Sequence, residues 1–270
     1  MTETKMNVQL IAHTQISEKF AHEILRKQDV SGYYDDPRSL LPRDGQAVAL
    51  TAIRTCYSAN KPTEIVAMEG AKYFGSKASD GGAGTDADRL FRHIFASKHT
   101  STLEHISFTF AIEGVSRALL AQLTRHRVGF SFSVQSQRYV RMGSDDRSGG
   151  FDYVTPPTVA EDKKVDHSPS LDFTHYISAA DHFSDAMEML QDVYDELRSL
   201  GVPAEDARAV LPNAAATNLV MTANLTALLS FYSKRKPGKG AQKEITELAE
   251  ALRREVVDVE PWTDQFFEEV

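Results

Sequence analysis

The stretch between Glu113 and Asp145 contains no acidic residue but is rich in side chains that bind anions. It carries five arginines and a histidine: Arg117, Arg125, His126, Arg127, Arg138 and Arg141. A guanidinium presents a planar fork of donors that matches phosphate and carboxylate, and the serines and glutamines between the arginines add neutral donors. A solvated basic surface is the alternative interpretation. The Arg-His-Arg run at an expected helix end, followed by a polar segment with its own arginine, favours a phosphate site.

Ser136 and Arg138 fall in residues 133–140, which we expect to be a strand or an extended stretch. Side chains two residues apart on a strand point to the same face. The Ser136 hydroxyl and the Arg138 guanidinium can then both donate hydrogen bonds to one phosphate. This pair is a candidate for the contact with a substrate phosphate.

A second polar group, His99, Thr100 and Ser101 followed by His105, precedes an expected strand. The hydroxyls of Thr100 and Ser101 suit a second phosphate or a ribose, and the competing interpretation is a helix end with capping hydroxyls. The two histidines raise the question of a metal site. Because the chain has one cysteine and no His-Glu-x-x-His motif, we expect no metal.

A third group lies late in the chain, where Arg208 precedes a strand that ends at Asn224. Ser230 and Arg235 lie on the helix after that strand, five residues apart. Arg235 closes this helix, and the helix dipole already favours a cation there. A purely structural role of Arg235 is therefore the alternative to a functional one.

Cys56 is the only cysteine of the chain and lies between Thr55 and Tyr57 in an apolar helix pattern. No histidine is near it in sequence. A lone cysteine in such a setting is usually a small buried hydrophobic residue. We therefore expect Cys56 to be buried and to have no role as a nucleophile.

Apolar periodicity and turn residues divide the chain into strands, helices and loops. The expected strands are residues 7–13, 106–113, 133–140 and 216–225. The expected helices are 47–58, 86–98 capped by Thr85 or Asp86, 115–127 after a break at Gly114, 173–200, 226–235 and 241–259. The expected loops are 30–46, 76–85 and 142–172. Strands and helices mix without a βαβ rhythm and no linker separates two cores, so we expect one α+β domain, with a mixed or antiparallel sheet flanked by helices.

The 270 residues carry 30 Lys and Arg against 38 Asp and Glu, a net charge of -8. A chain this acidic is a poor general binder of nucleic acid. One cysteine excludes an intramolecular disulfide framework and a cysteine-rich metal cluster. We see no secretory signal at the start and no apolar run that approaches the length of a membrane span, so we expect a cytoplasmic protein.

Several blocks of the sequence resemble the signature of the flavin-dependent thymidylate synthases. These blocks are HTSTLEHISFTF at 99–110, the helix ending in RHR at 125–127, SQR at 136–138, ARAVLP at 207–212, and Arg235 followed by AQKEI at 241–245. They occur in the family's order, although eight residues separate Arg127 from Ser136 where the commoner family pattern has seven. The resemblance covers roughly residues 50–60, 95–140 and 204–250.

The resemblance implies a methyltransferase that makes dTMP from dUMP, for dTMP biosynthesis. The carbon donor would be 5,10-methylenetetrahydrofolate, and NADPH would be the reductant, acting through FAD. The resemblance further implies a homotetramer with FAD at the subunit interfaces. It also implies a single synthase domain spanning residues 1–270, with insertions near 30–46 and 142–172.

The resemblance also implies roles for individual residues. Those that look like FAD-binding residues of the family are His99, Ser101, Arg125, His126, Arg127, Asn224 and Ser230. Those that look like dUMP-binding residues are Gln122, Arg125, Ser136, Gln137, Arg138, Arg208 and Arg235. Arg235 is similar to the family arginine that contacts the pyrimidine ring and favours its ionised, activated form. Positions at which the sequence departs from the common family pattern are Val134, Ser230, Lys234 and Gly240.

Two other functions use the same arginine-rich window. One is a non-enzymatic module that binds a nucleotide or a phosphate. The other is an RNA-binding protein that uses Arg127, Phe130 and Arg138 for stacking and phosphate contacts, which the net charge of -8 disfavours. A flavin spectrum of the purified protein separates the enzyme from both alternatives.

Overall fold

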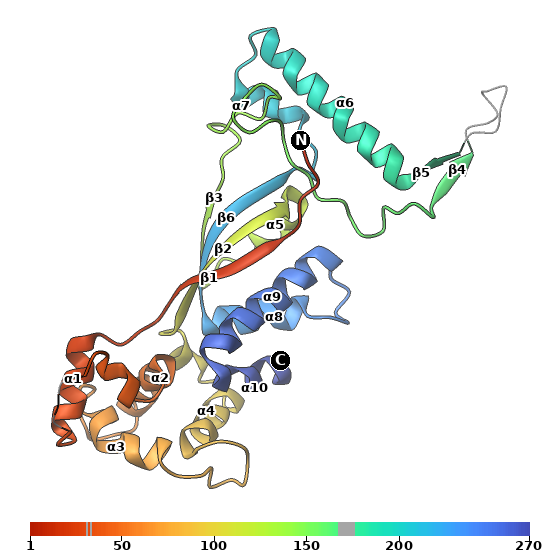
Figure 1. Cartoon of the computed structure of the whole chain (residues 1–270). Helices are drawn as coiled ribbons and strands as arrows, with labels where there is room; N and C mark the ends of the chain where they lie inside the picture. The colour runs from red at the N-terminus through yellow and green to blue at the C-terminus, as the bar shows by residue number, and fades with distance from the viewer. Residues whose placement is uncertain (31, 33, 167–175) are drawn as a thin grey trace.

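The computed structural model describes residues 1–30, 32, 34–166 and 176–270. At its centre lies a four-stranded antiparallel sheet in the order β1-β2-β6-β3 (Figure 1). The strands are β1 (Asn7–His13), β2 (Ser107–Ser116), β3 (Phe130–Val134) and β6 (Ala216–Asn224). This arrangement confirms the α+β class and makes the sheet antiparallel.

The two faces of the sheet differ because the strands alternate apolar and polar residues. Phe108 and Phe110 of β2 lie beside Ala223 and Met221 of β6, and all four are buried in the main core. The opposite face carries smaller and more polar side chains. It includes Val220 of β6, which is 41% exposed.

Gly114 does not end strand β2, so the expected break there is wrong. The strand continues to Ser116 through a bulge, with a register shift between Ile112 and Val115. Gly114 has φ +66°, and a Cβ at this position would meet the Lys5 carbonyl oxygen at 2.5 Å. A β-bulge accommodates a glycine inside a strand, so Gly114 alone does not mark the end of β2.

Helix α5 (Arg117–Leu123) is shorter than the expected helix 115–127. Ser116 caps its first turn by accepting a hydrogen bond from the Leu119 N–H. The helix ends before the Arg-His-Arg run, which therefore lies in the loop between α5 and β3. The expected strand 133–140 is also wrong beyond Val134, because residues 137–139 form a turn.

The N-terminal helices gather beyond one end of the sheet (Figure 1). They are α1 (Glu18–Lys27), η1 (Pro37–Leu40), α2 (Asp44–Thr55), α3 (Ile65–Phe74), α4 (Asp86–Ala96) and η2 (Thr100–Leu103). Helices α2 and α4 confirm two predictions, whereas α1 and α3 were not predicted. The expected loop 30–46 contains η1 and the first turn of α2, and residues 31 and 33 lie outside the described residues.

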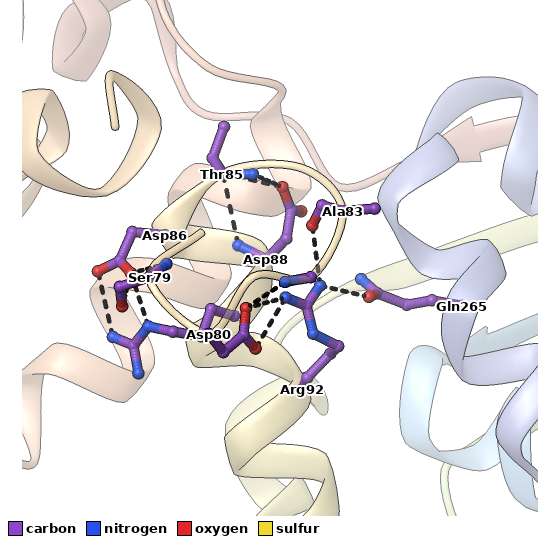
Figure 2. A network of polar contacts seen from close by, with 10 residues as sticks. Ser79, Asp80, Ala83, Thr85, Asp86, Asp88, Arg92 and Gln265 are labelled. Atoms are coloured by element: carbon purple, nitrogen blue, oxygen red, sulfur yellow. Dashed lines mark hydrogen bonds and ion pairs between the residues drawn. The ribbon is translucent and has the colours of Figure 1, made fainter. Parts of the chain in front are cut away.

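Thr85 is the N-cap of α4, as predicted, and forms a capping box with Asp88. The preceding loop is held by ion pairs that Figure 2 shows. Arg92 donates to both carboxylate oxygens of Asp80, to the Ala83 carbonyl and to Gln265. Residues 76–85 are thus tied to α4 and to the C-terminal end of the chain.

The C-terminal helices pack near the buried face of the sheet. They are α8 (Leu225–Arg235), α9 (Lys243–Val259), η5 (Pro261–Thr263) and α10 (Asp264–Glu269). Helices α8 and α9 confirm the predictions for 226–235 and 241–259. Their apolar residues, including Leu228, Phe231 and Leu252, complete the main core with β2 and β6.

A smaller core lies at the other end of the sheet, around the long helix that projects in Figure 1. The elements there are β4 (Lys164–Asp166), β5 (Tyr176–Ser178), α6 (Ala179–Ser199), α7 (Ala204–Ala207) and η4 (Arg208–Val210). Helix α6 begins at Ala179, six residues later than the expected start of helix 173–200. Residues 173–175 of that prediction, and 167–172 of the expected loop 142–172, lie outside the described residues.

In the described part of the chain, no helix is both long and apolar enough to cross a membrane.

Candidate functional site

Three arginines around α5 have no carboxylate partner in the part of the chain that the structure describes. Arg117 begins α5, and Arg125 and Arg127 lie in the exposed loop after it. None of the three forms an ion pair within the described residues, although the chain as a whole has more acidic than basic residues. Unpaired guanidinium groups gathered in an acidic protein are the donors that a bound anion needs.

Arg117 is half-buried, and its like-charged neighbour is Arg208 of η4. Burial lowers the pKa of Arg117, and the positive charge of Arg208 lowers it further. The backbone joins these regions, because the Arg117 N–H donates to the Ala215 carbonyl at 3.0 Å. Neither arginine forms an ion pair among the described residues, so the two guanidinium groups can bind a doubly charged phosphate. Sequence reasoning placed Arg117 in the basic window but missed it as a site residue, because only the fold brings it to Arg208.

Arg138 has a carboxylate partner that its sequence neighbours did not reveal. Its Nε donates to Glu205 Oε2 at 2.6 Å, and both side chains are exposed. Ser136 and Arg138 do not share a strand face as expected. The turn brings them together instead, because the Ser136 hydroxyl accepts a hydrogen bond from the Arg138 N–H at 3.2 Å. Gln137, between them, is buried.

Gln122 lies on α5 and contacts the start of α9. Its Nε2 donates to Gln242 Oε1 at 2.5 Å. A second link between the two helices is buried: Glu244 accepts hydrogen bonds from the N–H and the hydroxyl of Ser116, at 2.7 and 2.6 Å. These contacts fix the position of α5 and therefore of the arginines at its two ends.

Arg235 closes α8, as predicted, and meets His126 of the loop after α5. Arg235 Nη2 lies 3.4 Å from His126 Nε2. The Nε atom of Arg235 is buried and has no acceptor among the described residues. Burial lowers the pKa of His126, and the positive charges of Arg235, Lys234 and Arg125 lower it further.

Asn224 and Ser230 have different positions on α8. Asn224 is its N-cap, and its side-chain oxygen accepts a hydrogen bond from the Ala227 N–H at 2.8 Å. Ser230 is exposed in the middle of the helix. Because the cap already occupies the Asn224 oxygen, the side-chain amide nitrogen is the group that remains for a ligand.

His99 and Ser101 line a groove of about 770 Å³ beside α2 and η2. Its walls are mostly apolar, with Ala47, Val48 and Ala52 contributed by α2. A groove of this size and composition suits a planar ring system. None of the arginines described above lines it.

Cys56 lies at this groove and is exposed, so its expected burial is wrong. It is the C-cap of α2, which ends at Thr55, three residues before the end of the expected helix 47–58. The neighbouring Tyr57 hydroxyl lies 3.1 Å from His99 Nδ1. No group of three or more possible metal ligands occurs among the described residues.

Comparisons of the chain with known proteins point to one family. The model of a family described as "Thymidylate synthase complementing protein" matches residues 40–262. The flavin-dependent thymidylate synthase of Geobacter sulfurreducens is 38% identical over 218 residues, which are 81% of this chain and 80% of that protein. That of Nitratidesulfovibrio vulgaris is 43% identical over 167 residues, 59% of each protein.

Two solved structures share the fold. Thymidylate synthase X from Helicobacter pylori, with FAD and dUMP, is 22% identical and has a TM-score of 0.57 over 98% of each chain. A UMP/dUMP methylase from Streptomyces cacaoi, bound with 5-Br dUMP, is 20% identical with a TM-score of 0.64, over 99% of this chain and 97% of that one.

Proposed function

The chain belongs to the family of flavin-dependent thymidylate synthases, and we propose that its unpaired arginines and its groove are two parts of that family's active site. As a member of this family the chain is a methyltransferase that depends on FAD and converts dUMP to dTMP. Its co-substrates are 5,10-methylenetetrahydrofolate and NADPH. Family membership favours this enzyme over the non-enzymatic nucleotide-binding module and over the RNA-binding protein.

The observation that carries the proposed site is the set of guanidinium groups without carboxylate partners at Arg117, Arg125, Arg127 and Arg235. A nucleotide phosphate and a flavin pyrophosphate are both anions, so an acidic protein that binds them needs such donors. No carboxylate among the described residues competes for these four arginines.

The residues present fit FAD. Arg125 and Arg127 suit its pyrophosphate, and the apolar groove beside His99 suits its ring system. The residues that we propose to hold FAD are His99, Ser101, Arg125, His126, Arg127, Asn224 and Ser230. When bound, the flavin supplies the hydride that thymidylate formation requires.

We place the dUMP phosphate near Arg208, Arg117 and Arg138. The substrate-binding residues that we propose are Gln122, Arg125, Ser136, Gln137, Arg138, Arg208 and Arg235. The Arg138–Glu205 ion pair is exposed, and exposed pairs contribute at most about 1 kcal/mol. A phosphate can therefore displace Glu205 at little cost.

Arg235 is the catalytic residue that we propose. Uracil is a poor nucleophile at C5, and loss of the N3 proton raises the electron density of the ring. A guanidinium beside the ring oxygens stabilises the resulting anion and does not itself titrate. The buried Nε without an acceptor supports this role, because a donor in that state needs a ligand to satisfy it.

The complete site requires more than one copy of the chain in this proposal. Within the described residues of a single chain, the arginines around α5 do not line the groove at His99. We propose a homotetramer with FAD at its interfaces, in which these parts come from different copies. The cytoplasmic location and the extent of a single synthase domain over residues 1–270, with insertions near 30–46 and 142–172, are further parts of the proposal.

A spectrum of the purified protein tests the flavin. We expect the yellow absorbance of an oxidised flavin, and we expect NADPH to bleach it without oxygen. A colourless protein that neither takes up added FAD nor oxidises NADPH would contradict the proposal and would favour the nucleotide-binding module.

A further inference from the structure

His126 and Arg235 meet at the C-terminal end of α8, where their side chains are within hydrogen-bond distance. Arg235 Nη2 lies 3.4 Å from His126 Nε2. A guanidinium has only donors and stays protonated in proteins, so His126 Nε2 must be the acceptor of this hydrogen bond. A His126 ring that accepts this hydrogen bond is uncharged and carries its proton on Nδ1.

The surroundings of His126 favour the uncharged form. Burial lowers its pKa, and Arg235, Lys234 and Arg125 lower it further. All three charges that act on the ring are positive, and two of them lie on α8 and one on the histidine's own loop. The ring packs edge-on against Phe231 of α8, with centroids 4.9 Å apart, which limits its rotation.

The Arg235 guanidinium is held on one side and unsatisfied on another. His126 accepts from Nη2, whereas the buried Nε has no acceptor among the described residues. Arg235 needs a defined orientation, because a planar fork satisfies two acceptors only in its own plane. The neutral histidine is the group that supplies this orientation from the protein side.

We propose that His126 is a positioning residue for Arg235, an inference that rests on the proposed function. His126 accepts a hydrogen bond from the guanidinium and holds the guanidinium toward the pyrimidine. Protonation of His126 releases the guanidinium. Protonation removes the acceptor and places a second positive charge 3.4 Å from the guanidinium. Activation of the substrate should therefore decrease as the pH falls through the pKa of His126.

Lys234 offers a way to test this link without changing His126 or Arg235. Replacing Lys234 by Gln removes one of the cations that lower the pKa of His126. Because that positive charge disfavours the protonated imidazole, its removal should raise the pKa of His126. Lys239→Gln is the matched control, because Lys239 is exposed in the turn after α8 and does not act on His126.

The experiment compares two titrations in each protein. The pKa of His126 is measured by NMR on histidine-labelled holoenzyme, and the His126→Gln spectrum assigns its signal. In parallel, kcat for dTMP formation and the dUMP dissociation constant are measured from pH 5 to 8, with flavin content followed by absorbance. The titration of the dUMP phosphate is common to all variants and cancels in the comparison.

We expect His126 of the parent to titrate below the ordinary value of 6.5. In Lys234→Gln, both the NMR pKa and the acid limb of kcat should move to higher pH by the same amount, and in Lys239→Gln neither should move. The inference is overturned if His126 titrates at 6.5 or above, or if the acid limb does not follow the NMR pKa. A parent without dTMP formation at pH 8 would instead contradict the proposed function.

Discussion

Arg235 combines two properties that experiments can separate. It ends α8, where the helix dipole stabilises any cation, and it carries a buried Nε without an acceptor among the described residues. The first property needs only a positive charge. The second needs a planar group with several fixed donors, and lysine cannot provide it.

Arg235→Lys should therefore keep the fold and lose the reaction. We expect kcat to fall by about 100-fold or more, the usual effect of removing one electrostatic stabiliser. The melting temperature and flavin content should stay close to those of the parent. Steady-state kinetics of dTMP formation check this. A kcat within about twofold of the parent, a barrier change of ~0.4 kcal/mol, would leave Arg235 with the capping role alone.

Glu205 competes with the substrate phosphate for Arg138 in the proposed site. Glu205→Gln should make dUMP bind more tightly, by up to about fivefold, since an exposed pair contributes at most about 1 kcal/mol. Glu188→Gln is the control, because Glu188 is an exposed acid on α6 without an ion pair in the described residues. Calorimetric titration with dUMP gives both affinities. Equal affinities in the two variants would show that Glu205 does not oppose phosphate binding.

The elements show which parts of the fold are encoded locally. Strand 7–13, the Thr85 cap and the helix that ends at Arg235 follow from periodicity and capping alone, and the structure confirms them. The bulge at Gly114 and the turn after Val134 depend on pairing between distant strands, so no local pattern revealed them.

The site, like the fold, was only partly predictable from the sequence. Its arginines were visible as a run without acids, and the resemblance assigned most of their proposed roles. The pairing of Arg138 with Glu205, 67 residues away, was not visible, nor was the exposure of Cys56 at the end of α2. Both depend on which surfaces the fold brings together, and a sequence window contains only neighbours in the chain.

Gly114→Ala tests the bulge as an element. A non-glycine residue with positive φ costs about 1–3 kcal/mol, and here the new Cβ would also meet the Lys5 carbonyl. Gly81→Ala is the control for backbone strain, because Gly81 has φ +77° and nothing within 4 Å of the added Cβ. Urea unfolding should show a larger loss of stability for Gly114→Ala. Equal losses would mean that the contact with Lys5 contributes nothing.

The two proposed ligand-binding regions, the groove at His99 and the arginines around α5, lie on separate surfaces of the molecule. The groove lies beside α2 and η2, among the N-terminal helices, whereas α5 and α7 lie toward the other end of the sheet (Figure 1). Helix α5 begins with Arg117, and Arg208 directly follows α7. The described residues of one chain therefore do not bring these parts into one pocket. The proposed homotetramer explains this separation, since different copies supply different parts of each site.

Assembly and flavin binding should accordingly change together. Light scattering should give a mass near four times 30.0 kDa, about 120 kDa, for the yellow protein. Dilution that dissociates the assembly should release the flavin. A monomer that keeps one flavin per chain would contradict the interface site.

In the proposed function, this chain makes dTMP with a flavin and without a cysteine nucleophile. The most direct test is dTMP formation from dUMP and 5,10-methylenetetrahydrofolate by the purified Cys56→Ala protein, with and without NADPH. We predict turnover close to that of the parent, strictly dependent on NADPH, because Cys56 lies exposed at a helix end and has no place in the proposed chemistry. A folded, flavin-loaded Cys56→Ala protein that makes no dTMP, or a parent that makes dTMP equally well without NADPH, would contradict the account.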